Sequence, residues 1–293
     1  MPPIVVASLG SLLMVNYSTT DSWTAGGFGQ MFFDKDNQKM MVGMFGGKIR
    51  NDYQDFLGSG VSAQTTDDLQ VFFTRYSYRI KGDWYAGIQF ISTNYVIGAD
   101  GLFADFLQLI GLTGFDSNGL GLVAEYDSRD NVRNPTSGSL FDLNNVAYRE
   151  GLGGDEDFDV YNMKYSQYVS HGNQNVLAWE VKGRWTSDAP IGGYSSVDLR
   201  GYIRGNYLAP NATLAQLDER IMFTRSWGMS VFGGVSCLYD SLSDCNDSEN
   251  LYPAIGAGAI YVLKEEAGIV LRAEIAKGKS DERAFYLTMG QPF

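Results

Sequence analysis

The sequence predicts an all-β fold, namely a transmembrane antiparallel β-barrel that forms a single domain over residues 1–293. Three observations predict it: segments in which apolar and polar residues alternate, clusters of turn-forming residues between them, and a last alternating segment that ends on an aromatic residue. Alternation places one face of each strand against lipid and the other against water. At roughly 18 residues per strand and connection, the chain holds about 16 strands.

Composition favours one closed sheet. The chain has 35 Gly and 14% aromatic residues against 19% charged residues, which suits glycine-containing turns and aromatic girdles. Closure is expected because hydrocarbon offers no hydrogen-bond partner to an open strand edge. The sequence contains no run of 18 apolar residues, so no transmembrane helix is predicted. The apolar residues 4–15 are interpreted as the first strand.

The strand pattern is clearest at residues 267–276, where one face is wholly apolar and the other carries Arg272 and Glu274. Residues 176–185 and 84–90 divide in the same way, with turn clusters between such segments. Residues 98–116 fit helical spacing as well as strand spacing, and we expect a short strand and a loop there.

The last segment, residues 284–293, is predicted to be the terminal strand. Its faces separate large apolar side chains from smaller or polar ones: Phe285, Leu287, Met289 and Phe293 on one side, and Tyr286, Thr288 and Gly290 on the other. If the carboxyl end is periplasmic, counting hairpins backwards makes 187–205 and 239–251 external loops and 171–174 a periplasmic turn.

Several function classes are disfavoured. A formal charge of −12 makes nucleic acid an unfavourable partner, because phosphate contacts need clustered Lys and Arg. The one histidine, His171, is expected in a turn without a serine and acid beside it, which argues against a hydrolase. No metal or cofactor is predicted, since the sequence carries no metal-ligand spacing and no phosphate loop.

The two cysteines, Cys237 and Cys245, flank a polar loop and are close enough for a disulfide in an oxidising compartment, with two free thiols as the alternative. A zinc site is disfavoured because His171 lies far away in sequence.

Two motifs resemble the outer-membrane-protein-85 superfamily. The first is a predicted periplasmic turn with the residues Tyr126, Asp127, Arg129, Asp130, Asn131, Pro135 and Gly138. The second lies in the predicted external loop and consists of Leu199, Arg200, Gly201 and Tyr202. Together with the terminal strand, the resemblance spans residues 119–293. It implies that the Arg-Gly-Tyr loop folds down into the barrel.

The resemblance also implies a partner for Arg200 on the strand that follows the loop. Asp218 and Arg220 stand there, and alternation points both side chains to the lumen. Elementary physics expects such a partner too, because an unpaired buried arginine is costly. The assembly-type members carry a second acid two residues after a phenylalanine on the next strand. Here that position is Gly234, after Phe232, so this acid is missing.

The function implied is a non-enzymatic outer-membrane barrel that resembles protein assembly, insertion or translocation factors, in a short form without periplasmic domains. Gly290 and Pro292 predict weak pairing at the seam between first and last strands, where a client strand or a second copy could add. The expected partners are outer-membrane lipid and such strands. The alternatives are a passive diffusion pore and the barrel anchor of a larger secreted protein.

Overall fold

The structure is a computed structural model that describes residues 6–17, 22–53, 63–98, 105, 114–202, 205–265, 267–280 and 282–291. The chain divides into two compact units. Unit 1 comprises Met1–Ala124, Leu143–Tyr161 and Thr186–Tyr194, and unit 2 comprises Glu125–Asp142, Asn162–Trp185 and Ser195–Phe293.

The all-β prediction is confirmed. Fourteen described strands form one sheet, hydrogen-bonded in chain order: β1 (Val6–Tyr17), β2 (Trp23–Phe33), β3 (Gln38–Tyr53), β4 (Ala63–Lys81), β5 (Trp84–Gly98), β6 (Gly114–Asp127), β7 (Gly138–Tyr148), β8 (Phe158–His171), β9 (Asn175–Ser187), β12 (Asn211–Met222), β13 (Trp227–Tyr239), β14 (Leu251–Lys264), β15 (Ile269–Lys277) and β16 (Arg283–Met289). A separate two-stranded sheet pairs β10 (Ser195–Ser196) with β11 (Leu208–Ala209). Within the described part of the chain, the main sheet therefore has fewer strands than the predicted number. Strands such as β4, with 19 residues, are longer than the prediction assumed.

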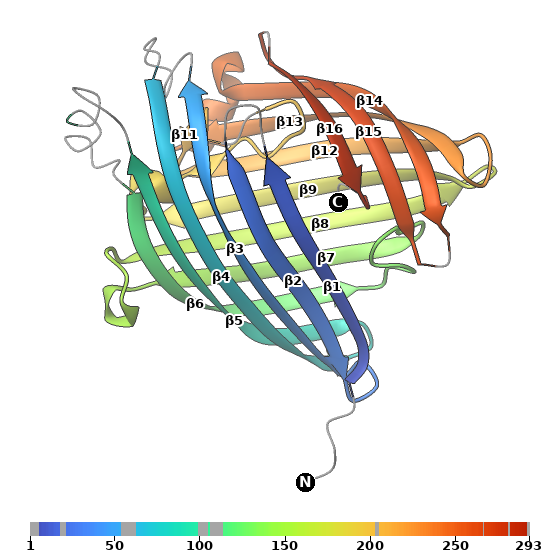
Figure 1. Cartoon of the computed structure of the whole chain (residues 1–293), viewed down its shortest axis with the longest axis horizontal. Coiled ribbons are helices and arrows are strands. Elements are labelled where there is room, and N and C mark those ends of the chain that lie inside the picture. Colours follow the sequence, from blue (N-terminus) through green and yellow to red (C-terminus); the bar gives the residue numbers. More distant parts are fainter. Residues whose placement is uncertain are drawn as a thin grey trace. The chain divides into compact units, whose positions relative to one another are not determined.

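Unit 1 contains β1–β5, which follow one another as antiparallel hairpins (Figure 1). The predicted alternation in 84–90 is confirmed on β5, where Trp84 and Ile88 are exposed and Tyr85 and Gln89 are buried. The segment 98–116, predicted as a short strand and loop, falls largely outside the described residues, between the end of β5 and the start of β6. Unit 1 also holds two short 3-10 helices, η2 (Glu150–Leu152) and η3 (Ile191–Gly193).

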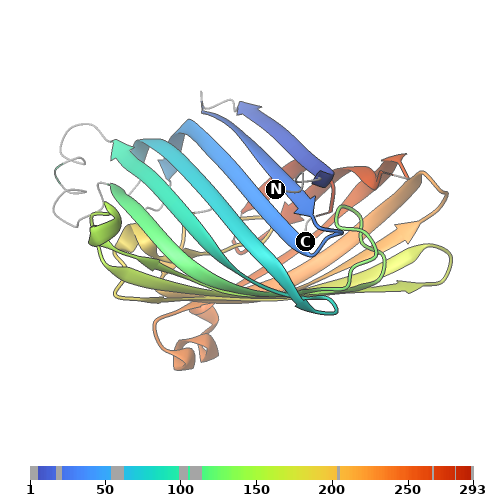
Figure 2. The same ribbon diagram turned by 90° about the horizontal axis from the view of Figure 1, so that it is seen from below.

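Unit 2 contains β12–β16, again paired antiparallel in chain order. On β12 the buried residues Leu214, Gln216, Asp218 and Arg220 alternate with more exposed ones, so one face of the strand is polar and enclosed. Figure 2 shows the short helices η4 (Leu242–Asn246) and η5 (Ser248–Asn250) extending from the loop between β13 and β14. The predicted disulfide between Cys237 and Cys245 is confirmed and closes this loop.

The terminal strand alternates as predicted, since Phe285, Leu287 and Met289 are all exposed. Its predicted extent is wrong, however, because β16 ends at Met289 instead of continuing to residue 293. Gly290 has φ of +104°, which turns the backbone out of the extended conformation, and its N–H donates to the Val270 carbonyl at 2.7 Å. Pro292 and Phe293 lie outside the described residues.

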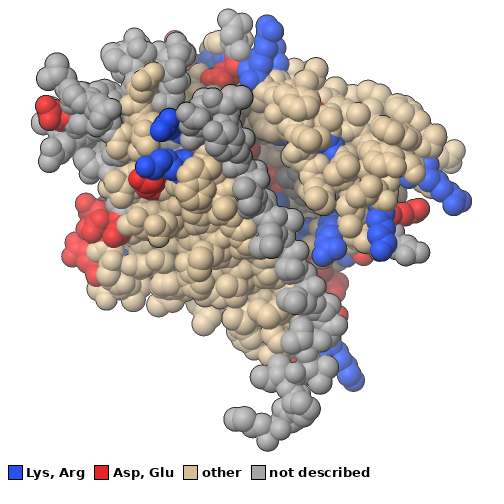
Figure 3. Space-filling view, viewed as in Figure 1, with Lys and Arg blue, Asp and Glu red and all other residues tan. Residues whose placement is uncertain are grey.

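Exposed apolar side chains are a general feature of the strands. Figure 3 shows broad surface areas without charged side chains, with Lys, Arg, Asp and Glu grouped at their margins. Within the described part of the chain, no helix has the length and apolar character needed to cross a membrane.

Candidate functional site

The candidate site lies in unit 2, where residues 195–202 lie against strands β12–β16. The β10–β11 pair brings Ser195 opposite Ala209 and so closes the base of this segment, which we call the Arg200 loop. Its apolar side chains are buried in a cluster with three strand residues: Val197, Leu199, Tyr202, Leu214, Leu238 and Tyr252. The loop is therefore held by apolar packing as well as by polar contacts.

Arg200 forms two ion pairs. Its Nη2 lies 3.0 Å from Oδ2 of Asp218 on β12, and its Nη1 lies 2.9 Å from Oε1 of Glu274 on β15. The exposed fractions of the Asp218 and Glu274 side chains are 0% and 2%. Because two strands far apart in sequence supply the two carboxylates, Arg200 joins the loop to both of them.

A second arginine completes the cluster. Arg272 Nη2 lies 2.8 Å from Asp218 Oδ2 and 2.5 Å from Glu274 Oε1, and its side chain is fully buried. Each carboxylate therefore lies between two guanidinium groups, as a buried ion pair needs if its desolvation is to be offset. Ser230 on β13 adds a hydroxyl that donates to Glu274 Oε1 at 3.2 Å.

The Phe232 ring packs against the Arg200 guanidinium. The guanidinium carbon lies 3.4 Å from the centre of the Phe232 ring, in a cation–π contact, and Phe232 is buried. The ring lies over Gly256 of β14, where an added Cβ would stand 2.2 Å from the ring. Only glycine at position 256 leaves space for the Phe232 ring in this position.

The rest of the loop contacts β14, β16 and the turn between β15 and β16. Gly201 N–H donates to the Tyr286 hydroxyl on β16 at 2.8 Å. The Tyr202 hydroxyl donates to the Pro253 carbonyl at 2.6 Å and accepts from Lys279 N–H at 2.7 Å. Gly201 itself has φ of +106°, a conformation that side chains other than glycine rarely adopt.

The other predicted motif, which contains Asp130, forms the turn at residues 128–137, between β6 and β7. Asp130 organises it, since its Oδ1 accepts from the backbone N–H groups of Asn131, Thr136 and Ser137 and its Oδ2 accepts from the Thr136 hydroxyl. Burial alone would raise the pKa of Asp130, but these hydrogen bonds, led by those from Thr136, outweigh it and lower that pKa below its ordinary value.

Other motif residues have separate structural tasks. Arg129 Nε pairs with Asp127 Oδ1 at 2.9 Å. Gly138 has φ of +93°, and a Cβ there would lie 2.2 Å from the Ser128 carbonyl oxygen, so only glycine fits. Tyr126 lies on β6, and Pro135 is fully buried.

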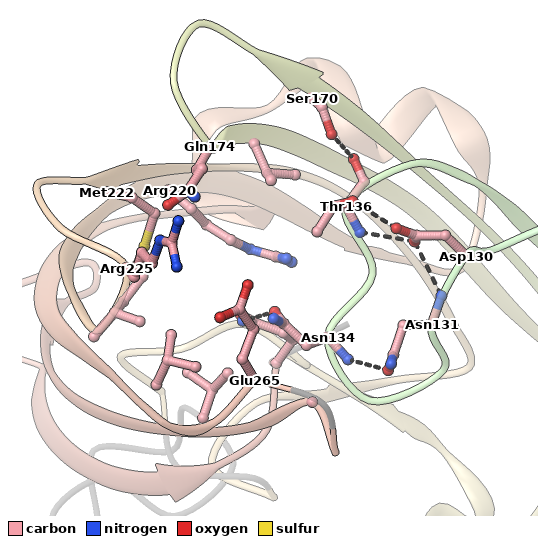
Figure 4. Close-up of a pocket in the computed structure, with 16 residues that line it drawn as sticks. Asp130, Asn131, Asn134, Thr136, Ser170, Gln174, Arg220, Met222, Arg225 and Glu265 are labelled. Carbon is pink, nitrogen blue, oxygen red and sulfur yellow. Dashed lines mark hydrogen bonds between the residues drawn. The ribbon is translucent and has the colours of Figure 1, made fainter.

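Polar contacts run from the Arg200 cluster to this turn. Arg272 donates to the Gln291 side-chain oxygen, and Gln291 Nε2 donates to Asn134 Oδ1 at 2.6 Å. Arg220 Nη1 donates to the Pro135 carbonyl at 2.8 Å. Figure 4 shows Arg220 and Asn134 on opposite sides of a cavity of about 510 Å³ that the turn helps to enclose.

The sequence-predicted residues thus fall into two groups. Arg200 and Asp218 lie together, whereas Arg220 reaches Asp218 only at 3.8 Å and bonds the 128–137 turn instead. Glu274 and Arg272 were not predicted as partners of the loop. The signal available was their position on the polar face of a strand, but alternation does not say which strand the loop will meet. His171 contacts Glu219, with 2.7 Å between Nε2 and Oε1.

The described residues contain no group of three or more His, Cys, Asp or Glu side chains placed to hold a metal ion. What the arrangement does offer is a loop fixed to the sheet by buried charges.

Residues 14–211 match the family model described as the Omp85 superfamily domain. No curated protein sequence is significantly similar to the chain.

Solved structures with a similar fold include the following three. The first is BamA from Haemophilus ducreyi lacking POTRA domains 1–3, with a TM-score of 0.59 and 12% identity over 96% of this chain and 70% of that one. The second is CdiB from Acinetobacter baumannii, with a TM-score of 0.58 and 9% identity over 96% of this chain and 52% of that one. The third is CdiB from Escherichia coli, with a TM-score of 0.58 and 10% identity over 93% of this chain and 54% of that one. The chain thus spans about half the length of the CdiB proteins.

Proposed function

Since the chain belongs to the Omp85 superfamily, we propose that it assembles or translocates proteins at the outer membrane and that the Arg200 loop gates this activity. Barrels of this superfamily reside in the outer membrane of Gram-negative bacteria and are non-enzymatic assembly or translocation factors. In this proposal the loop, the 128–137 turn and the terminal strand act together in protein assembly or translocation.

The observation that carries the proposal is the double ion pair of Arg200 with Asp218 and Glu274. Buried charges are costly to separate, so the loop stays in place until both pairs break together. A loop held in this way narrows the passage inside a barrel, and its release would widen it. The same pairs would also stabilise a barrel in which the loop has no part in transport, and the rate of client folding with Arg200→Ala separates these roles.

The edge of the terminal strand β16 is the proposed site of client entry. This strand stands at one end of the hydrogen-bonded order. β16 has only seven residues, and Gly290 turns its backbone away after Met289. A short terminal strand offers few ladder bonds to a neighbour, which makes it a suitable edge for a client strand or a second copy.

The experiment uses the intact protein in liposomes and measures how fast an unfolded outer-membrane β-barrel client folds into them. We expect the wild type to accelerate folding over empty liposomes and Arg200→Ala to change that rate by several-fold. Arg225→Ala is the matched control, because Arg225 is an exposed turn residue.

Equal rates for the wild type and Arg200→Ala would assign Arg200 to stability alone, provided that both variants are fully folded in the liposomes. Equal rates for the wild type and empty liposomes would refute the insertion activity and favour a passive pore.

A further inference from the structure

A shallow apolar hollow lies on the exposed face of β13–β16, opposite the face that carries the Arg200 cluster. Its volume is about 640 Å³. The walls are Ile255, Ile275 and Phe285, which are 64%, 65% and 67% exposed. Side chains this apolar and this exposed belong against the hydrocarbon of the membrane.

The strand register explains why the surface is hollowed at this place. Val231, Ala257, Ile275 and Phe285 are successive cross-strand partners on β13, β14, β15 and β16. Ala257 is the one small side chain in this row. Large side chains around this small residue leave a depression between them.

Two cations stand at one end of the hollow. Lys277 on β15 is the direct cross-strand partner of Arg283 on β16, and Ile255 on β14 is the other partner of Lys277. Both cations line the hollow, and both are exposed. Like charges directly opposite one another destabilise a strand pair. Neither cation forms an ion pair or a side-chain hydrogen bond with any residue that the structure describes, so their repulsion is uncompensated within this part of the protein.

We propose that the hollow binds a lipid of the outer membrane whose phosphate headgroup has a net negative charge, with an acyl chain over Ala257 and the phosphate between Lys277 and Arg283. A phosphate oxygen between the two side chains accepts charge-assisted hydrogen bonds from both and removes the repulsion. The acyl chain covers the apolar walls at the same time. A ligand that is both anionic and apolar satisfies the two halves of the site, whereas a neutral lipid satisfies only one.

The site is independent of the loop chemistry. Lys277 and Arg283 are exposed and take no part in the Arg200 cluster. Binding therefore requires only that this face meets the membrane, and failure of the gating proposal would leave it unaffected.

The test is native mass spectrometry of the intact protein in a neutral detergent, with phosphatidylglycerol and phosphatidylcholine of identical acyl chains as probes. We expect the wild type to retain phosphatidylglycerol at roughly tenfold lower lipid concentration, because each basic residue near an anionic headgroup adds to binding. The double variant Lys277→Gln/Arg283→Gln should lose this preference. The control Lys264→Gln/Arg225→Gln removes the same charge from exposed residues outside the hollow and should keep it.

A third variant tests the apolar half. Ala257→Leu fills the depression, and we expect several-fold weaker retention of both lipids. Folding is checked by the melting temperature without added lipid, which should not fall in Lys277→Gln/Arg283→Gln, since that variant removes a repulsive pair. Equal retention of the two lipids by the wild type, or a preference that survives the double substitution, would overturn the site for an anionic headgroup. Unchanged retention of both lipids by Ala257→Leu would overturn the proposed binding of the acyl chain over Ala257.

Discussion

Arg200 binds Glu274, 74 residues further along the chain, with 2.9 Å between Nη1 and Oε1. Position 234 on β13, where the assembly-type members carry a second acid, is glycine in this chain. Glu274 on β15 provides a second carboxylate for the loop instead. Because β15 is the neighbour of the terminal strand β16, the loop is connected to the last hairpin as well as to β12. Movement of the loop and loosening of that hairpin should therefore be coupled.

Removing this second carboxylate should destabilise unit 2. Glu274→Ala leaves Arg200 and Arg272 to share Asp218, and breaking a buried pair in this way costs about 3–5 kcal/mol. We expect a lower temperature for loss of the folded band in semi-native electrophoresis. Glu265→Ala, at an exposed turn position, is the control and should behave like the wild type. A Glu274→Ala protein with wild-type thermal stability would contradict the assigned role of Glu274.

The turn motif predicts a strong difference between two glycines. Gly138 and Gly153 have similar φ values, +93° and +88°, so alanine at either carries a left-handed backbone cost of about 1–2 kcal/mol. At Gly138 the new Cβ also meets the Ser128 carbonyl oxygen at 2.2 Å, whereas at Gly153 the nearest atom is an Asn118 side-chain nitrogen at 3.5 Å. Gly138→Ala should lower the urea midpoint of unfolding markedly more than Gly153→Ala, and equal midpoints would refute the steric argument.

The pKa of Asp130 predicts a pH dependence for the 128–137 turn. A carboxyl group whose pKa is lowered in the folded state contributes stability above its unfolded pKa of about 4 and loses it as the pH falls through the folded value. The free energy of unfolding should therefore differ between the wild type and Asp130→Asn by a constant amount from pH 7 to about 5. Below about pH 4 that difference should shrink. A difference that grows on acidification would show that the charged form of Asp130 does not stabilise the turn.

The disulfide should act locally. Cys237 and Cys245 close a small loop between β13 and β14, for which the chain-entropy account gives about 2–3 kcal/mol. Paired Cys→Ser substitutions should raise proteolysis within residues 240–250 while leaving the lipid-embedded strands protected. Cleavage that spreads into β13 or β14 would instead assign the disulfide to the sheet as a whole.

Local patterns predicted the strands and turns well because alternation and turn chemistry are properties of neighbouring residues. Alternation predicted both the polar face with Arg272 and Glu274 and the apolar face with Phe285, Leu287 and Met289. The partnership of Arg200 with Glu274 was not, since it depends on which strand the loop meets after folding. The early end of β16 was also missed, because alternation does not reveal that Gly290 takes a positive φ.

Arg220 illustrates the same limit from the other side. Its face on β12 was predicted correctly, and it is buried as expected. Its partner was not the loop but the Pro135 carbonyl, 85 residues earlier in the chain. Period-two alternation predicts which face of the sheet a side chain lies on. The partner that it meets on that face depends on which loop or turn packs there after folding.

The most direct test of the gating proposal is the single-channel conductance of the intact protein in planar bilayers, measured beside Arg200→Ala. A loop held by Asp218 and Glu274 predicts a small, flickering conductance in the wild type that grows when Arg200 is removed. A large, steady conductance that Arg200→Ala leaves unchanged would contradict the gated loop and make a passive pore the better account.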